Sequence, residues 1–99
     1  MKITKDLNGT SATLLVEGRI DTTTAPELQA ELNEIIKDAD EVTLDLSQLV
    51  YISSSGLRVL LSAHKSMTKK GGTLYIKNVS EDVMEVFEIT GFSGILTIV

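Results

Sequence analysis

The chain has 99 residues, enough for one compact domain but too few for two independent hydrophobic cores. Its 42% hydrophobic and 23% charged residues exclude the polar bias of a disordered chain, so we expect it to fold by itself. The net charge of −5 opposes extensive contact with phosphates, and we therefore expect no nucleic-acid partner.

The residues that the chain lacks narrow its class further. It has no cysteine, which excludes disulfides, thiolate zinc sites and thiol nucleophiles and is compatible with a reducing compartment. No segment approaches the ~18 apolar residues of a membrane span, and the opening MKITKDLNGT does not resemble a signal peptide. We expect a cytoplasmic protein with no direct membrane insertion.

The chain opens with a predicted hairpin. Residues 2–7 and 11–20 read as strands, and Asn8-Gly9 between them is a hairpin-turn signal, so the two strands should be antiparallel.

A first helix is predicted near residues 24–37. Thr24 and Glu27 stand in capping-box register at its start, and Pro26 lies in its first turn. Its apolar residues recur at helical spacing: Leu28, Leu32, Ile35 and Ile36.

Residues 41–49 alternate in a way that predicts a half-buried or central strand, and the segment VYISSSGLRVLL follows at residues 50–61. A second helix is predicted near residues 55–70, ending at Gly71. One apolar stripe defines it: Leu57, Leu60, Leu61, His64 and Met67. Leu60 and Leu61 should both be largely buried.

The C-terminal part predicts a strand at 72–79, a helix near 81–90 and a short closing strand at 94–99. Ser80 is the expected N-cap of that helix, and Gly91 lies just past its end. Because helices separate most of the strands, parallel pairing is favoured. We predict an α/β fold, a single domain spanning residues 1–99, with a mixed sheet of about five strands packed against helices.

Polar residues gather where two of these strands lead into helices. Ser53, Ser54 and Ser55 precede one helix, and Asp21, Thr22, Thr23 and Thr24 precede another. Loops at the carboxyl ends of strands are the usual functional edge of such a fold. One serine is explained as an N-cap, worth ~1 kcal/mol, but three exceed that need.

Other polar and aromatic residues have structural explanations. Asp21 would favour the positive end of a helix, and Lys65, Lys69 and Lys70 the negative end of another. His64 should lie at the margin of its apolar stripe. The remaining candidates read as core or core-edge residues: Tyr51, Phe87 and Phe92.

An enzymatic function is disfavoured. His64 lies nine residues after Ser55 on the same helix, which is roughly 13 Å at ~1.5 Å per residue and too far for a serine–base pair. The sequence has no nucleophile-elbow or phosphate-loop pattern and no metal-ligand spacing. We expect no catalytic residues, no metal and no cofactor.

Three segments carry a family resemblance that covers nearly the whole chain. They are GRIDTTTAPELQAEL, VTLDLSQLVYISSSGLRVLLSAHKSMTKKGGTLYI and VMEVFEITGF. Together they resemble the STAS domain of anti-sigma factor antagonists.

The resemblance implies partner switching. The residue before the glycine of the family's D-S-[ST]-G segment is phosphorylated by an anti-sigma factor that is itself a serine kinase and binds ATP. By position that residue is Ser55, with Ser54 as an alternative. The unphosphorylated protein binds the anti-sigma factor and frees a sigma factor, phosphorylation ends the binding, and a phosphatase reverses it. The implied partner-binding residues are Asp21, Thr22, Thr23, Ser53, Ser54, Ser55, Gly56 and Leu57.

One position departs from the family pattern, because Ser53 stands where the family has an aspartate. Whether this variant is phosphorylated is left open. A second function also remains open, since STAS domains serve as docking or regulatory subunits of anion and lipid transporters.

Overall fold

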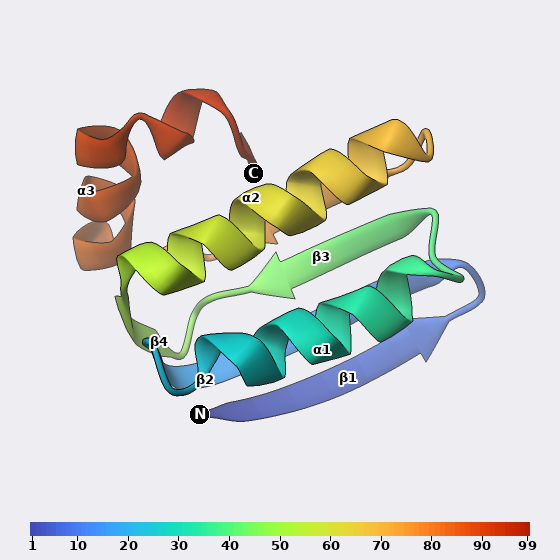
Figure 1. Ribbon diagram of the computed structural model, residues 1–99, viewed down its shortest axis with the longest axis horizontal. Helices are drawn as coiled ribbons and strands as arrows, with labels where there is room; N and C mark the ends of the chain where they lie inside the picture. The colour runs from blue at the N-terminus through green and yellow to red at the C-terminus, as the bar shows by residue number, and fades with distance from the viewer.

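The structure is a computed structural model that describes residues 1–99 (Figure 1). It opens with the antiparallel hairpin of β1 (Lys2–Asn8) and β2 (Ser11–Ile20), as the sequence predicts. Asn8 pairs with Ser11, so the two loop residues are Gly9 and Thr10. The φ of +62° at Gly9 is one that glycine adopts without strain.

Three helices and four further strands follow. They are α1 (Ala25–Ile36), β3 (Glu41–Asp45), β4 (Leu49–Ile52), α2 (Ser54–Lys69), β5 (Thr73–Lys77), α3 (Glu81–Thr90) and β6 (Thr97–Ile98), with a short 3-10 helix at Phe92–Gly94. The predicted mixed α/β fold and the three predicted helices are confirmed. None of the helices combines the length and apolar character needed to span a membrane.

The sheet has six strands instead of about five. Its main path is β1-β2-β3-β5-β6, and every pairing after the hairpin is parallel. The additional strand is β4, which pairs in parallel with the end of β2. Its separate existence follows from a turn after β3, where the Asp45 carboxylate accepts from the Ser47 N–H at 2.9 Å and Leu49 N–H donates to the Leu46 carbonyl.

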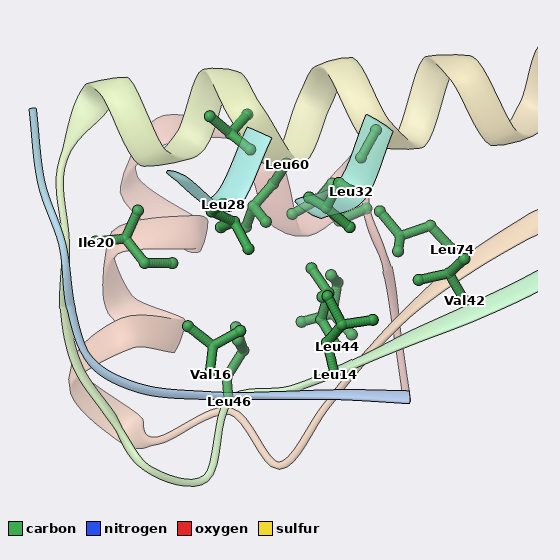
Figure 2. Packing of buried hydrophobic residues seen from close by; sticks show 14 of the residues in the cluster. Leu14, Val16, Ile20, Leu28, Leu32, Val42, Leu44, Leu46, Leu60 and Leu74 are labelled. Carbon is green, nitrogen blue, oxygen red and sulfur yellow. The ribbon is translucent and has the colours of Figure 1, made fainter. Parts of the chain in front are cut away.

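The core lies between the sheet and the pair α1 and α2, which run side by side over one face (Figure 1). Figure 2 shows Leu28 and Leu32 of α1 and Leu60 of α2 facing the apolar residues of the strands. On β2, β3 and β5 alternate residues are fully covered: Leu14, Val16, Val42, Leu44, Leu74 and Ile76. This alternation is the period of two expected of a strand with one face toward a core.

Two predictions about burial were wrong. Leu61 is only half-buried, because α2 turns Val59, Leu60 and Ala63 toward the core instead. Tyr51 is 42% exposed, whereas Phe87 is fully buried and Phe92 partly buried, as predicted.

Some of the residues that cap the helices were predicted from the sequence, and one was not. Ser80 accepts from the Val83 N–H, and Gly91 ends α3 in the left-handed conformation, as predicted. Lys70 instead reaches across to α1, where its Nζ donates to the carbonyls of Ile36 at 2.6 Å and Ala39 at 2.7 Å. It therefore caps α1, the neighbouring helix.

Candidate functional site

The two polar loops meet at one edge of the sheet. Ile20 at the end of β2 pairs in parallel with Ile52 at the end of β4, and the Ser53 N–H donates to the Ile20 carbonyl at 2.8 Å. The loop that starts at Asp21 and the serine run that starts at Ser53 are therefore neighbours. Both α1 and α2 begin at this end of the molecule (Figure 1).

The Asp21 carboxylate organises the first loop. One of its oxygens accepts from the Thr23 hydroxyl at 2.7 Å, from the Thr23 N–H at 3.0 Å and from the Thr24 N–H at 3.1 Å. The Thr23 hydroxyl, followed by the Thr24 N–H, holds the pKa of Asp21 below its usual value, so the carboxylate is charged at neutral pH.

The predicted capping box at Thr24 is wrong. Thr24 has helical backbone angles and its side chain caps no N–H of α1. Its hydroxyl accepts from the Asp21 N–H at 2.8 Å and donates to the Arg19 carbonyl at 2.9 Å, while the Ala25 N–H donates to the Asp21 carbonyl. Asp21 and Thr24 thus close a turn that precedes α1. Thr22, between them, is exposed and makes no side-chain hydrogen bond.

Ser53 is the N-cap of α2. Its backbone is extended, its hydroxyl accepts from the Gly56 N–H at 3.3 Å, and its carbonyl accepts from the Leu57 N–H at 3.0 Å. Serine and aspartate are both preferred N-caps. Ser53 therefore provides the cap without the negative charge that an aspartate would bring.

Ser54 and Ser55 occupy the first two positions of α2. Ser54 is exposed and Ser55 is half-buried, and neither hydroxyl has a hydrogen-bond partner within the chain. Their backbone N–H groups belong to the first turn of the helix, where no intrahelical acceptor is available. An anion at this position would meet those N–H groups and the positive end of the helix dipole.

Gly56 and Leu57 form the buried base under the serines. A Cβ atom on Gly56 would lie 2.7 Å from side-chain carbons of both Ile20 and Ile52, so a side chain there would push α2 away from the two strands. Leu57 is 5% exposed and belongs to the core. Their contact with a partner remains a prediction, and their place in the structure fixes the position of Ser54 and Ser55.

One feature of this edge was missed by the sequence analysis. The Arg19 guanidinium lies 4.2 Å from the centre of the Tyr51 ring, on paired residues of β2 and β4. Tyr51 is exposed because the pairing shifts by one residue between Gly18 and Arg19, so that both Val50 and Tyr51 lie outside the core. The sequence carries no signal for that shift.

The chain as a whole is similar to a known family and to named relatives. The profile described as STAS domain matches residues 2–99. The chain is 37% identical over 99 residues to BtrV of Bordetella bronchiseptica, a protein assigned as an anti-sigma factor antagonist, with 99% of this chain and 85% of the relative covered. It is 32% identical to the anti-sigma-B factor antagonist of Bacillus subtilis, over 84% of this chain and 76% of the relative.

Solved structures with the same fold include an anti-sigma factor antagonist and a transporter family protein. The anti-sigma factor antagonist SpoIIAA in its unphosphorylated form has a TM-score of 0.79 and 14% identity, covering 99% of this chain and 87% of that one. The phosphorylated form of SpoIIAA from Bacillus has a TM-score of 0.78 and 15% identity, covering 99% and 91%. A sulfate transporter family protein from Wolinella succinogenes reaches 0.78 at 21% identity, covering 93% and 75%.

At these identities the structural matches establish the fold alone, and the transporter match therefore does not favour the transporter function. The sequence relatives at 37% and 32% identity both carry names of anti-sigma factor antagonists. The chain belongs to the STAS-domain family, with the anti-sigma factor antagonists as its relatives.

Proposed function

We propose that this chain is an anti-sigma factor antagonist that works by partner switching in the cytoplasm. In its unphosphorylated form it binds an anti-sigma factor and thereby releases a sigma factor. The anti-sigma factor is a serine kinase that binds ATP and phosphorylates Ser55, which ends the binding, and a phosphatase restores it. The chain is the substrate of the phosphoryl transfer and has no enzymatic role.

The observation that carries this proposal is the division of roles among the three serines. Ser53 caps α2, so its hydroxyl is engaged, whereas the hydroxyls of Ser54 and Ser55 have no partner in the chain. Capping explains one serine. The other two place free hydroxyls at the start of α2, where the resemblance to the family implies the phosphorylated residue.

Ser55 and Ser54 are supported by different arguments. Ser55 has the position of the family's acceptor, directly before Gly56, whereas Ser54 is the more exposed of the two. We place the phosphate on Ser55 because it directly precedes Gly56, whose close packing against Ile20 and Ile52 holds the start of α2 in place. Ser54 is the alternative acceptor that the experiment must separate from it.

The physical basis of the switch is a change of surface charge on a fold that tolerates it. A phosphate adds about −1.5 to −2 charges at pH 7. At the start of α2 this charge is stabilised by N–H groups and the helix dipole, so the fold should persist. SpoIIAA has been solved in both phosphorylation states, which supports this tolerance. The partner, in contrast, would meet a new anion at the centre of its contact, together with Asp21.

The test is to incubate the chain with its purified anti-sigma factor and ATP and to map the phosphate by mass spectrometry. Ser54→Ala and Ser55→Ala form a matched pair at adjacent positions. We expect one phosphate on the wild type and on Ser54→Ala, and none on Ser55→Ala. Phosphate confined to Ser54 would contradict the assigned acceptor, and no phosphate on either serine would contradict the switch.

A further inference from the structure

A long segment in the second half of the chain contains no acidic residue. None of the 14 Asp and Glu residues lies between Asp45 and Glu81, although this segment holds five of the nine Lys and Arg residues. α2 lies inside it and carries positive charge only. α1 beside it carries Glu27, Glu31 and Glu34.

The cations of α2 lie on one exposed face of the helix. Arg58, Lys65 and Lys69 are all exposed, and spacings of seven and eleven residues place Lys65 and Lys69 each within about 20° of Arg58 on an α-helix. The same part of α2 carries a shallow groove of about 420 Å³, lined by Arg58, Leu61, Ser62, Lys65 and Ser66. We call this surface the α2 basic face; its residues are Arg58, Leu61, Ser62, Lys65, Ser66 and Lys69.

The chain itself does not neutralise these cations. The two ion pairs in the structure are Lys5 with Glu31 and Lys37 with Glu34, and neither includes a residue of α2. Lys70, next along the chain, donates to the carbonyls of Ile36 in α1 and of Ala39 just after it, and so has a structural role. Arg58, Lys65 and Lys69 pair with no carboxylate, which leaves a positive surface on a protein with a net charge of −5.

The position of this face connects it to the switch. It begins one turn after Ser55, because Arg58 lies three residues further along the same helix, a spacing at which side chains are neighbours. Leu61, half-buried, is the one apolar residue that lines the groove. Cations beside a small apolar contact suit a segment whose own side chains are mainly acidic.

We propose that the α2 basic face binds an acidic segment of the anti-sigma factor, so that the contact extends from the serines along α2. This inference rests on the proposed function. A phosphate on Ser55 would lie at the head of the face, where it repels the acidic segment and competes with it for Arg58.

The first test compares two double variants with the same change in net charge. Lys65→Glu with Lys69→Glu alters the α2 basic face, whereas Lys2→Glu with Lys37→Glu alters exposed lysines on β1 and after α1. At low salt we expect the first to weaken binding to the purified anti-sigma factor by about tenfold or more and the second by less than about threefold. Wild-type affinity should fall with added salt. Equal effects of the two double variants would overturn the inference.

A second test needs no natural partner. The ¹⁵N-labelled chain is titrated with a synthetic octaglutamate peptide and followed by NMR. We expect amide shifts concentrated in residues 58–69 and lost in Lys65→Glu with Lys69→Glu. Amide shifts of equal size near Lys2 and Lys37 and in residues 58–69 would overturn the inference. Shifts in residues 58–69 that depend on protein concentration without any peptide would also overturn it, because they would show that α1 of a second copy occupies the α2 basic face.

The two tests separate this inference from the proposed function. An anti-sigma factor that binds both double variants equally, yet releases the Ser55-phosphorylated chain, contradicts the inference and leaves the proposed function intact. If no anti-sigma factor binds the wild type, the proposed function fails, and the peptide titration still decides whether the α2 basic face binds acidic segments.

Discussion

Gly56 shows how a single residue controls the geometry of the site. Any side chain there would meet Ile20 and Ile52 at 2.7 Å. We predict that Gly56→Ala destabilises the protein by about 1–3 kcal/mol, because the strain of overpacking outweighs the gain of ~1 kcal/mol in helix propensity. Urea unfolding measures the change.

Gly94 provides the control for that substitution. A Cβ atom on Gly94 would meet nothing within 4 Å. Gly94→Ala should therefore leave the free energy of unfolding nearly unchanged. A Gly56→Ala variant as stable as the wild type would show that α2 does not depend on this close approach.

Asp21 links the site to pH. Because hydrogen bonds, that from the Thr23 hydroxyl first, lower its pKa in the folded protein, its ionised form favours folding at any pH above its unfolded pKa. That contribution is lost as the pH falls through the lowered value. We predict that stability falls less steeply over this acidic range in Asp21→Asn than in the wild type.

The same residue can be titrated directly by NMR of its carboxyl carbon. Thr23→Val, which removes the donating hydroxyl, should move the pKa of Asp21 back toward its usual value. Thr22→Val is the matched control, because the Thr22 side chain makes no hydrogen bond in the structure. A pKa of Asp21 unaffected by Thr23→Val would refute the assigned cause.

At the scale of the elements, the orientation of α2 gives two adjacent leucines different degrees of burial. Leu60 is fully buried and Leu61 half-buried. We predict that Leu60→Ala costs about 2–5 kcal/mol through lost burial and a residual cavity, and that Leu61→Ala costs less than half as much. Thermal or urea unfolding of the two variants gives the comparison, and equal losses would contradict the orientation of α2.

Regular periodicity made the helices and the parallel strands predictable, whereas the turns could not be predicted from the sequence pattern. The alternation of Val42, Leu44 and Leu46 predicted one strand through residue 49, but the hydrogen bond from Ser47 to Asp45 breaks it and creates β4. Thr24 matched a capping pattern, yet its hydroxyl bonds back to residues 19 and 21. Such local competition between side chain and backbone depends on loop geometry that spacing alone does not encode.

At the scale of the whole molecule, the candidate site was predictable as a set of residues but not as an arrangement. The polar loops were visible at the ends of two strands. Their contact depends on the parallel pairing of Ile20 with Ile52, and β4 was not predicted. The stacking of Arg19 on Tyr51 depends on a shift in the same pairing. The register between β2 and β4, which are far apart in the sequence, therefore brings the two polar loops together into one surface.

The acidic and basic residues of the molecule are also concentrated on different helices. The acidic α1 and α3 lie on either side of the cationic α2 in sequence, and the serines stand where α2 begins. A phosphate on Ser55 would thus add negative charge at the head of the one helix that otherwise carries none. The switch is effective in this account because it changes the sign of the local field at the contact.

The most direct test of the central claim is the affinity of the anti-sigma factor for the chain before and after stoichiometric phosphorylation of Ser55, measured by calorimetry. The account predicts a loss of about a hundredfold or more, because a like-charge contact costs several kcal/mol and each ~1.4 kcal/mol is tenfold in affinity. Circular dichroism and melting temperature should barely change. An unchanged affinity with Ser55 fully phosphorylated would contradict the account.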